Sequence, residues 1–240
     1  MVTPKILYAQ MKKWVDKGMG RPALELIYFS GEKAYATNTH HLAIVKNYPV
    51  KEAHYETPDG YEEKQDLPEK PLDYERPLIQ ENDALWKYEV NFGPLLFKDF
   101  ITPWKMAIDF LAKATKKQEY KPIILQKKGK RLLAYAAPNE KWLKAKIVLI
   151  DNLEDDGRDW EMGFNSAYLL DIVDFLKATE PEKLKIFINK AATVLTVETE
   201  DLILTTTCLR ILEQSGTAKT HAQEVVAFMR SEAADSQFLD

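Results

Sequence analysis

The chain of 240 residues contains a single cysteine, Cys208. One thiol cannot form an internal disulfide framework or the four-cysteine ligand set of a structural zinc site. The sequence also lacks any apolar run of about 18 residues, which excludes a transmembrane helix, and it lacks an apolar signal region at its start. We therefore expect a cytoplasmic protein that does not interact with membranes.

An excess of basic residues is also missing. Lysine and arginine number 33 against 37 acidic residues, so the net charge is −4, whereas a nucleic-acid-binding domain usually shows the opposite balance. A local basic surface remains compatible with that total. The nine glycines form no phosphate-binding loop, so we expect no nucleotide cofactor. A hydrophobic content of 45% with 29% charged residues is typical of a globular protein with a substantial core.

The clearest pattern in the sequence runs from Trp160 to Ile211. Asn165-Ser166 is a typical helix start, and Glu180-Pro181 ends the helical pattern. Between them an apolar stripe recurs at helical spacing, on Leu169, Ile172, Val173 and Leu176. Three alternating or β-branched runs follow, at residues 184–188, 193–198 and 202–204. The stretch therefore predicts one helix followed by three strands.

Two further segments repeat this order. A helix predicted at 3–17, with Thr3 as its cap, precedes the strand-like runs LELIYF, KAYAT and HLAIVK. A helix predicted to begin at Thr102-Pro103 precedes PIILQ, RLLAYAA and WLKAKIVLI. Residues 47–82 are rich in proline and predict an extended connection, and a last helix is predicted at about 220–233. The sequence thus predicts an α+β protein of repeated helix-and-strand units.

Short sequence motifs in this chain resemble those of the bacterial DNA sliding clamp, the β subunit of the replicative polymerase. The last segment of that family has a strand ending in GFN followed by YLLD and a helix, matched here by Gly163, Phe164, Asn165, Tyr168, Leu169, Leu170 and Asp171. The run ATNTHHLA, residues 36–43, resembles ATDGHRLA of the family's middle domain, and PLDYER, residues 71–76, resembles its interdomain segment FPDYER.

The resemblance implies the DNA clamp (processivity) fold, built of strand-helix-three-strand units with curved antiparallel sheets. It implies a partial clamp-like domain with a proline-rich connection at 1–82, a complete one at 83–212, and a C-terminal helical extension at 213–240. The family binds partner peptides in a hydrophobic pocket, which would use Thr37, Thr39, His40, His41, Leu42, Thr207, Cys208, Leu209, Arg210 and Ile211. Thr39 replaces a glycine of the family and can adopt glycine's backbone angles only at a cost, so we expect a pocket of altered shape.

By the same resemblance, basic helix faces would contact the phosphates of double-stranded DNA without regard to its sequence, as a closed homo-oligomer encircles the duplex. The lysines on those faces are Lys5, Lys12, Lys13, Lys105, Lys113, Lys116 and Lys117. A solvated helix surface is the alternative interpretation of these lysines. The helix after Ser166 carries Asp171 and Asp174 instead, which suits DNA less well.

The resulting hypothesis is a non-enzymatic processivity factor that encircles or tracks DNA and tethers a DNA polymerase or another replication protein. The alternative is a clamp-fold protein-interaction module that does not encircle DNA. An α+β enzyme remains a third possibility because of the acidic residues 151–159, although they lack the alternation and the closing glutamate of a calcium loop. His40 and His41 would point to opposite faces of a strand and could not bind one metal ion together, so we expect no metal site. We also expect no catalytic residues.

Overall fold

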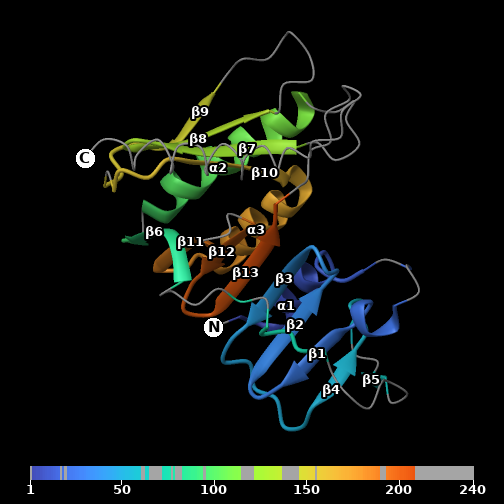
Figure 1. Ribbon diagram of the computed structural model, residues 1–240. Coiled ribbons are helices and arrows are strands. Elements are labelled where there is room, and N and C mark those ends of the chain that lie inside the picture. The colour runs from blue at the N-terminus through green and yellow to red at the C-terminus, as the bar shows by residue number, and fades with distance from the viewer. Residues whose placement is uncertain are drawn as a thin grey trace, which may run out of the picture. The chain divides into compact units, whose positions relative to one another are not determined.

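The computed structural model describes residues 2–16, 18, 21–60, 63–64, 72–76, 78, 83–93, 96–114, 122–136, 146–154, 156–189 and 193–208. The helices are α1 (Pro4–Met11), α2 (Leu96–Ala114) and α3 (Ser166–Thr179), with a short 3-10 helix η1 (Pro22–Leu24). The strands, labelled in Figure 1, are β1 (Ile27–Ser30), β2 (Lys33–Thr37), β3 (His41–Val45), β4 (His54–Glu56), β5 (Glu63–Lys64), β6 (Ala84–Asn91), β7 (Pro122–Lys128), β8 (Arg131–Ala136), β9 (Ile147–Ile150), β10 (Trp160–Asn165), β11 (Lys183–Asn189), β12 (Val194–Glu198) and β13 (Leu202–Thr207).

The strands form two sheets. One has nine strands in the order β5-β4-β1-β2-β3-β13-β12-β11-β6, and the other has four in the order β10-β7-β8-β9. All of the strand pairs formed by described residues are antiparallel. The predicted α+β class with antiparallel sheets is therefore confirmed.

The predicted repeat is also present. Two segments have the order strand, helix, three strands: β6-α2-β7-β8-β9 and β10-α3-β11-β12-β13. Each gives its first strand to the other's sheet, because β6 pairs with β11 and β10 pairs with β7. The third copy is α1 followed by β1, β2 and β3. The exchange of first strands ties the two complete copies together through backbone hydrogen bonds, which few side-chain substitutions could remove.

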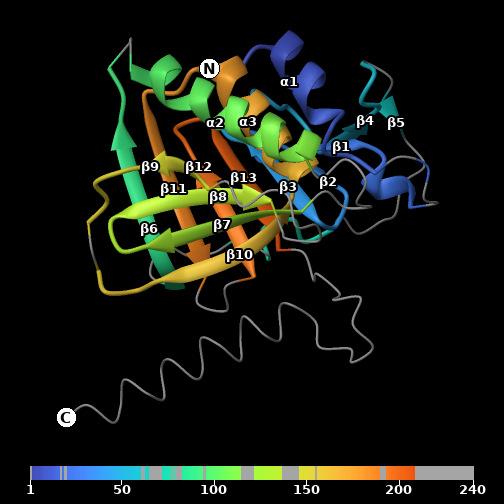
Figure 2. The ribbon, with the colours of Figure 1, turned by 90° about the horizontal axis from the view of Figure 1, so that it is seen from above.

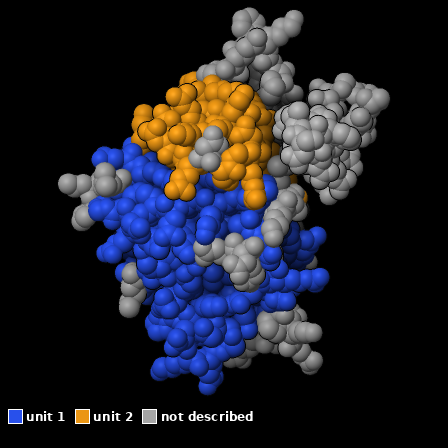
Figure 3. All heavy atoms as spheres, turned by 60° about the vertical axis from the view of Figure 1, so that its left-hand side comes forward, with its two compact units in different colours: residues 1–102, 171–190, 194–207 blue, residues 103–170, 191–193, 208–240 orange. Residues whose placement is uncertain are grey.

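The chain divides into two compact units, coloured separately in Figure 3. Unit 1 comprises residues 1–102, 171–190 and 194–207 and contains the nine-stranded sheet. Unit 2 comprises residues 103–170, 191–193 and 208–240 and contains the four-stranded sheet. These units follow contacts rather than chain order, so the domains inferred at 1–82, 83–212 and 213–240 stay predictions.

Local sequence signals set the starts of two helices. The Thr3 hydroxyl accepts a hydrogen bond from the Ile6 N–H at the start of α1, and the Asn165 side chain accepts one from the Ala167 N–H at the start of α3. For α2 the prediction was wrong, because the helix begins at Leu96 and Pro103 lies inside it. Proline removes only the hydrogen bond to the carbonyl of Asp99, and Asp99 is exposed, so water can replace that bond.

In unit 1, α1 and α3 lie along the same face of the nine-stranded sheet (Figure 2). Small and branched side chains cover the middle of this face, on Ala36, Ala43, Leu204, Val197 and Ile186, and all five are buried. The two alanines leave room for helices to approach the strands closely. An ion pair between Lys13 and Asp174 at 2.9 Å joins the end of α1 to α3.

In unit 2, the acidic loop after β9 is bound to the β7–β8 hairpin. The Lys127 side chain is fully buried and donates to the Asp156 carboxylate at 2.6 Å and to the Arg158 carbonyl at 2.6 Å. The Gly129 N–H donates to Asp159 at 2.8 Å. The described part of the loop is thus held by structural contacts, and among the described residues no group of three His, Cys, Asp or Glu could hold a metal ion.

Candidate peptide-docking face

Pairing of β3 with β13 brings together two of the segments that the sequence singled out. Leu42 lies opposite Thr205, and His41 lies opposite Thr206. The pairing continues beyond the strands, because the Thr207 N–H and hydroxyl donate to the His40 carbonyl at 2.9 and 3.1 Å. Thr207 and His40 are 167 positions apart in the chain. The two predicted parts of the pocket, residues 37–42 and residue 207, are therefore neighbours.

Strand alternation decides which of these side chains share a surface. On the sheet face opposite α1, one cross-strand row contains Thr37, Leu42, Thr205, Thr196 and Phe187. The adjacent row contains Tyr28, Tyr35, Ile44 and Ile203. We call this surface, defined by these two rows, the tyrosine face. Its chemistry is apolar and hydroxyl-rich. Most of its side chains are buried within the chain, and Thr37, Tyr28 and Ile203 are its half-buried members.

The segment around Tyr74 packs against the tyrosine face. Tyr74 stacks on Tyr28 with ring centroids 5.5 Å apart and lies 5.1 Å from the ring of Tyr35. Glu75 accepts hydrogen bonds from the Tyr35 hydroxyl at 3.0 Å and from Lys33 at 2.6 Å. Burial and the bond to Glu75 raise the pKa of Tyr35, so its hydroxyl stays protonated at neutral pH. The segment that resembles the interdomain motif of the clamps thus borders the candidate site.

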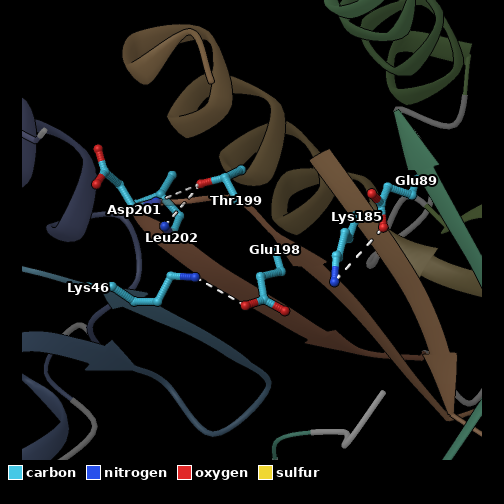
Figure 4. A network of polar contacts seen from close by, with 7 residues as sticks. All are labelled: Lys46, Glu89, Lys185, Glu198, Thr199, Asp201 and Leu202. Atoms are coloured by element: carbon cyan, nitrogen blue, oxygen red, sulfur yellow. Dashed lines mark hydrogen bonds and ion pairs between the residues drawn. The ribbon is translucent and has the colours of Figure 1, made fainter. Parts of the chain in front are cut away.

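Charged side chains follow on the same face beyond β13. Glu198 lies opposite Ile203, and Lys185 lies opposite both Glu198 and Glu89. Lys46 binds Glu198 at 3.1 Å and Lys185 approaches Glu89 at 3.9 Å, as Figure 4 shows. These partly exposed pairs add little stability. They do make a polar border beside the apolar rows, as is common at the rim of an interface.

His41 does not share the tyrosine face. Its ring lies 4.5 Å from the ring of Trp14 in an edge-to-face arrangement, and its Nε2 lies 3.3 Å from the Lys13 carbonyl oxygen. The side chain is only 3% exposed. Burial lowers the pKa of His41 to about 4, against a smaller opposing effect of the bond to Lys13. His41 therefore belongs to the core beneath α1, where it is neutral at pH 7.

Thr39 has a backbone angle that glycine adopts more readily than other residues. Its φ is 77°, in the left-handed region that costs a residue with a side chain roughly 1–2 kcal/mol. The Thr37 hydroxyl accepts the Thr39 N–H at 3.1 Å, and Asn38 accepts the N–H groups of His40 and His41 at 3.0 and 3.1 Å. These hydrogen bonds hold the turn and offset that cost, and the expected change of pocket shape stays a prediction.

Of the remaining predicted pocket residues, the structure describes only Cys208. Cys208 is half-buried and its N–H donates to the Thr193 carbonyl at 2.8 Å, whereas Leu209, Arg210 and Ile211 lie outside the described residues. Sequence reasoning missed Thr205, Ile203, Ile44 and Tyr35 as members of this surface. Alternation from Thr37, Leu42 and Thr207 would have found them, since residues two apart on a strand share a face.

The predicted DNA-facing lysines differ in their surroundings. Lys5 and Lys12 on and beside α1 are exposed, as is Lys113 on α2, and Lys105 is half-buried. Lys13 is already paired with Asp174. Lys116 and Lys117 lie outside the described residues. Of the described lysines, Lys5, Lys12 and Lys13 therefore belong to unit 1, and Lys105 and Lys113 belong to unit 2.

Solved structures with the same arrangement are bacterial sliding clamps. The sliding clamp of Bacillus subtilis superposes with a TM-score of 0.66 at 16% identity, covering 86% of this chain and 62% of the clamp. The polymerase III β subunit of Borrelia burgdorferi gives 0.66 at 14%, covering 85% and 61%, and that of Pseudomonas aeruginosa gives 0.61 at 16%, covering 85% and 65%. The chain has the bacterial sliding-clamp fold.

This clamp-fold chain spans less than two thirds of the length of those clamps. No protein-family model and no curated protein sequence matches it. In the part of the chain that the structure describes, no helix combines the length and apolarity needed to span a membrane. At this level of identity the likeness establishes the fold, and the activity must be argued from the surfaces of this chain.

Buried His41 predicts an acid-sensitive fold. The ordinary pKa of histidine is 6.5 and that of His41 is about 4, so the unfolded state binds the proton more tightly. Neutral His41 therefore adds to the free energy of unfolding above pH 6.5, and this contribution is lost as the pH falls toward 4. Between pH 7 and pH 5 the free energy of unfolding should fall by about 2 kcal/mol. Chemical unfolding at both pH values should show this loss, and His41→Gln should lack it. An equal loss in the variant would exclude His41 as its source.

Proposed function

We propose that this protein is a clamp-like processivity factor, which tracks along or encircles duplex DNA as a homo-oligomer and tethers a DNA polymerase or another replication protein. The tyrosine face is the proposed tether site. The observation that carries the proposal is the β3–β13 pairing, which aligns Thr37, Leu42 and Thr207 on one surface. Catalysis has no part in this role.

The tether would work by burial of apolar side chains of a peptide. Full burial of a leucine- or phenylalanine-sized side chain contributes roughly 1.5–3 kcal/mol, so two anchors would dominate the affinity. Ile203 is partly exposed beside the buried Leu42 and Ile44, which leaves apolar surface next to the part of the face that Tyr74 covers. By resemblance, Cys208, Leu209, Arg210 and Ile211 would extend this surface.

A charge on the tyrosine face should weaken the tether. Ile203→Lys should lower the affinity for a glutamine-plus-hydrophobic clamp-binding peptide by about tenfold or more, because one anchor loses its apolar partner. Fluorescence anisotropy with the labelled peptide measures this effect. Ile147→Lys in β9 is the matched control, since Ile147 is also half-buried on a strand but belongs to the four-stranded sheet. Equal binding by both variants would remove the tyrosine face from the proposal.

Phosphate contacts by α2 should appear in the salt dependence of DNA binding. For Lys105→Gln with Lys113→Gln, the slope of log affinity against log salt should fall by about 0.9 for each lysine that contacts a phosphate. Duplexes of unrelated sequence should respond alike. Lys128→Gln, at an exposed lysine of β7, is the control for lost charge. An unchanged slope in the double variant would mean that these lysines are only a solvated surface.

The second candidate is a clamp-fold interaction module that does not encircle DNA. It is favoured by Lys13 being paired with Asp174, by Asp171 and Asp174 on α3, and by the net charge of −4. The mass of the full chain in solution discriminates the two candidates. Under the encircling proposal several copies of this chain would close the ring, so light scattering should find a stable oligomer. A strict monomer at every concentration, with or without DNA, would leave only the interaction module.

A further inference from the structure

The exposed side of helix α2 carries an apolar pair with a charge at each end. Met106 is 67% exposed and Phe110 is 51% exposed, and these are the two most exposed large apolar side chains among the described residues. They are four residues apart, so they are neighbours on the helix surface. Asp99 precedes Met106 by seven residues, Lys113 follows it by seven, and both are exposed. Seven residues are close to two helical turns, so these four side chains form one stripe along α2.

The buried side of α2 is a different side of the helix. Ile101, Ile108 and Leu111 are almost fully buried, and helical spacing places all three away from the stripe. The stripe is therefore not needed to pack α2 against its own chain. An exposed apolar patch with polar side chains around it is the pattern of an interaction surface.

The charges of α2 are balanced. Its charged side chains are Lys98, Asp99, Lys105, Asp109 and Lys113. Lys98 already approaches Glu180 at 3.6 Å. The other four are two acids and two bases, and of these Lys105 and Asp109 are half-buried beside the stripe. The surface therefore favours neither a strongly acidic nor a strongly basic partner.

The order of these charges makes the stripe complementary to itself. If two copies of α2 lie antiparallel with Met106 at the centre, Asp99 of each copy faces Lys113 of the other. The match arises because both residues lie seven positions, about 10 Å, from Met106. Asp109 of each copy then comes within two positions of Lys105 of the other, so the flanking charges also have opposite signs. A parallel arrangement would instead place like charges together, which is unfavourable.

From these observations we propose that this stripe is a self-association surface, on which a second copy of the chain docks with its own α2 antiparallel. The contact has two-fold symmetry, so it closes at two copies and builds no ring by itself. One helix from each copy gives an interface smaller than the roughly 1,600 Å² of stable complexes, so the dimer forms at high protein concentration. The pairing does not depend on the function proposed above. One consequence does rest on it: the pair covers Lys113, so pairing and DNA binding would compete.

Disulfide crosslinking of the full chain locates the contact. In a Cys208→Ser background, Met106→Cys places two thiols at the symmetry axis, and mild oxidation should give a covalent dimer. Thr102→Cys is the matched control, because Thr102 is also exposed on the stripe. Its two copies would lie about 12 Å apart along the helices, whereas a disulfide needs Cα atoms within about 7 Å. Equal crosslinking of the two variants would overturn the proposal.

Charge reversal tests the antiparallel register. Asp99→Lys alone and Lys113→Asp alone each set like charges against each other at both ends of the pair. Each should weaken dimerisation by about tenfold in sedimentation equilibrium. An equal mixture of the two variants should recover the affinity, because both ends then join opposite charges. A mixture as weak as the single variants would overturn the register and with it the proposal.

Both experiments are independent of the tether and of DNA, since neither peptide nor duplex is present. A ring built on other surfaces would show neither the preference for Met106→Cys over Thr102→Cys nor the recovery on mixing. Failure here is therefore distinguishable from failure of the proposed function. Asp99, Thr102, Met106 and Lys113 are all exposed, so these substitutions leave the core intact.

Discussion

Antiparallel pairing of β3 with β13 joins segments from the two ends of the described chain. Without it, the nine-stranded sheet would separate into β5-β4-β1-β2-β3 and β13-β12-β11-β6, with β3 and β13 as additional open edges. The bonds extend past both ends of the ladder, since the Lys46 N–H donates to the Asp201 carbonyl at 2.7 Å and the Thr207 N–H donates to that of His40 at 2.9 Å. The helices on one face and the tyrosine face on the other are both aligned by this pairing.

The pairing also explains why one sheet carries two kinds of surface. A cross-strand row that begins with Tyr28 and Tyr35 continues through Ile203 to Glu198 and Lys185. Its aromatic part is covered by Tyr74, and its charged part is exposed to water in partly screened ion pairs. A peptide that docks on the apolar part would meet charges at its border. Such an arrangement gives affinity from burial and selectivity from the polar rim.

The opposite side of unit 1 shows why the fold does not by itself imply DNA binding. Lys13, which the resemblance assigns to DNA, binds Asp174 at 2.9 Å. A phosphate would have to displace that carboxylate, and Asp171 on the same helix adds a second negative charge. In unit 2, Met106 and Phe110 of α2 are exposed, as is Lys113. The fold alone therefore does not assign these helix surfaces to DNA.

The sequence by itself determined the local elements, because caps and periodicity act within a few residues. Thr3 and Asn165 begin helices, alternation marks the strands of each copy, and the clamp-like sequence motifs predicted the clamp fold. Only the tertiary structure decided that β3 lies beside β13, that Leu42 faces Tyr35 while His41 packs on Trp14, and that α2 continues through Pro103. Thr39 likewise takes a left-handed angle because Thr37 and Asn38 hold its turn. Strand neighbours and the buried face of a strand depend on contacts distant in sequence, and local patterns carry no record of them.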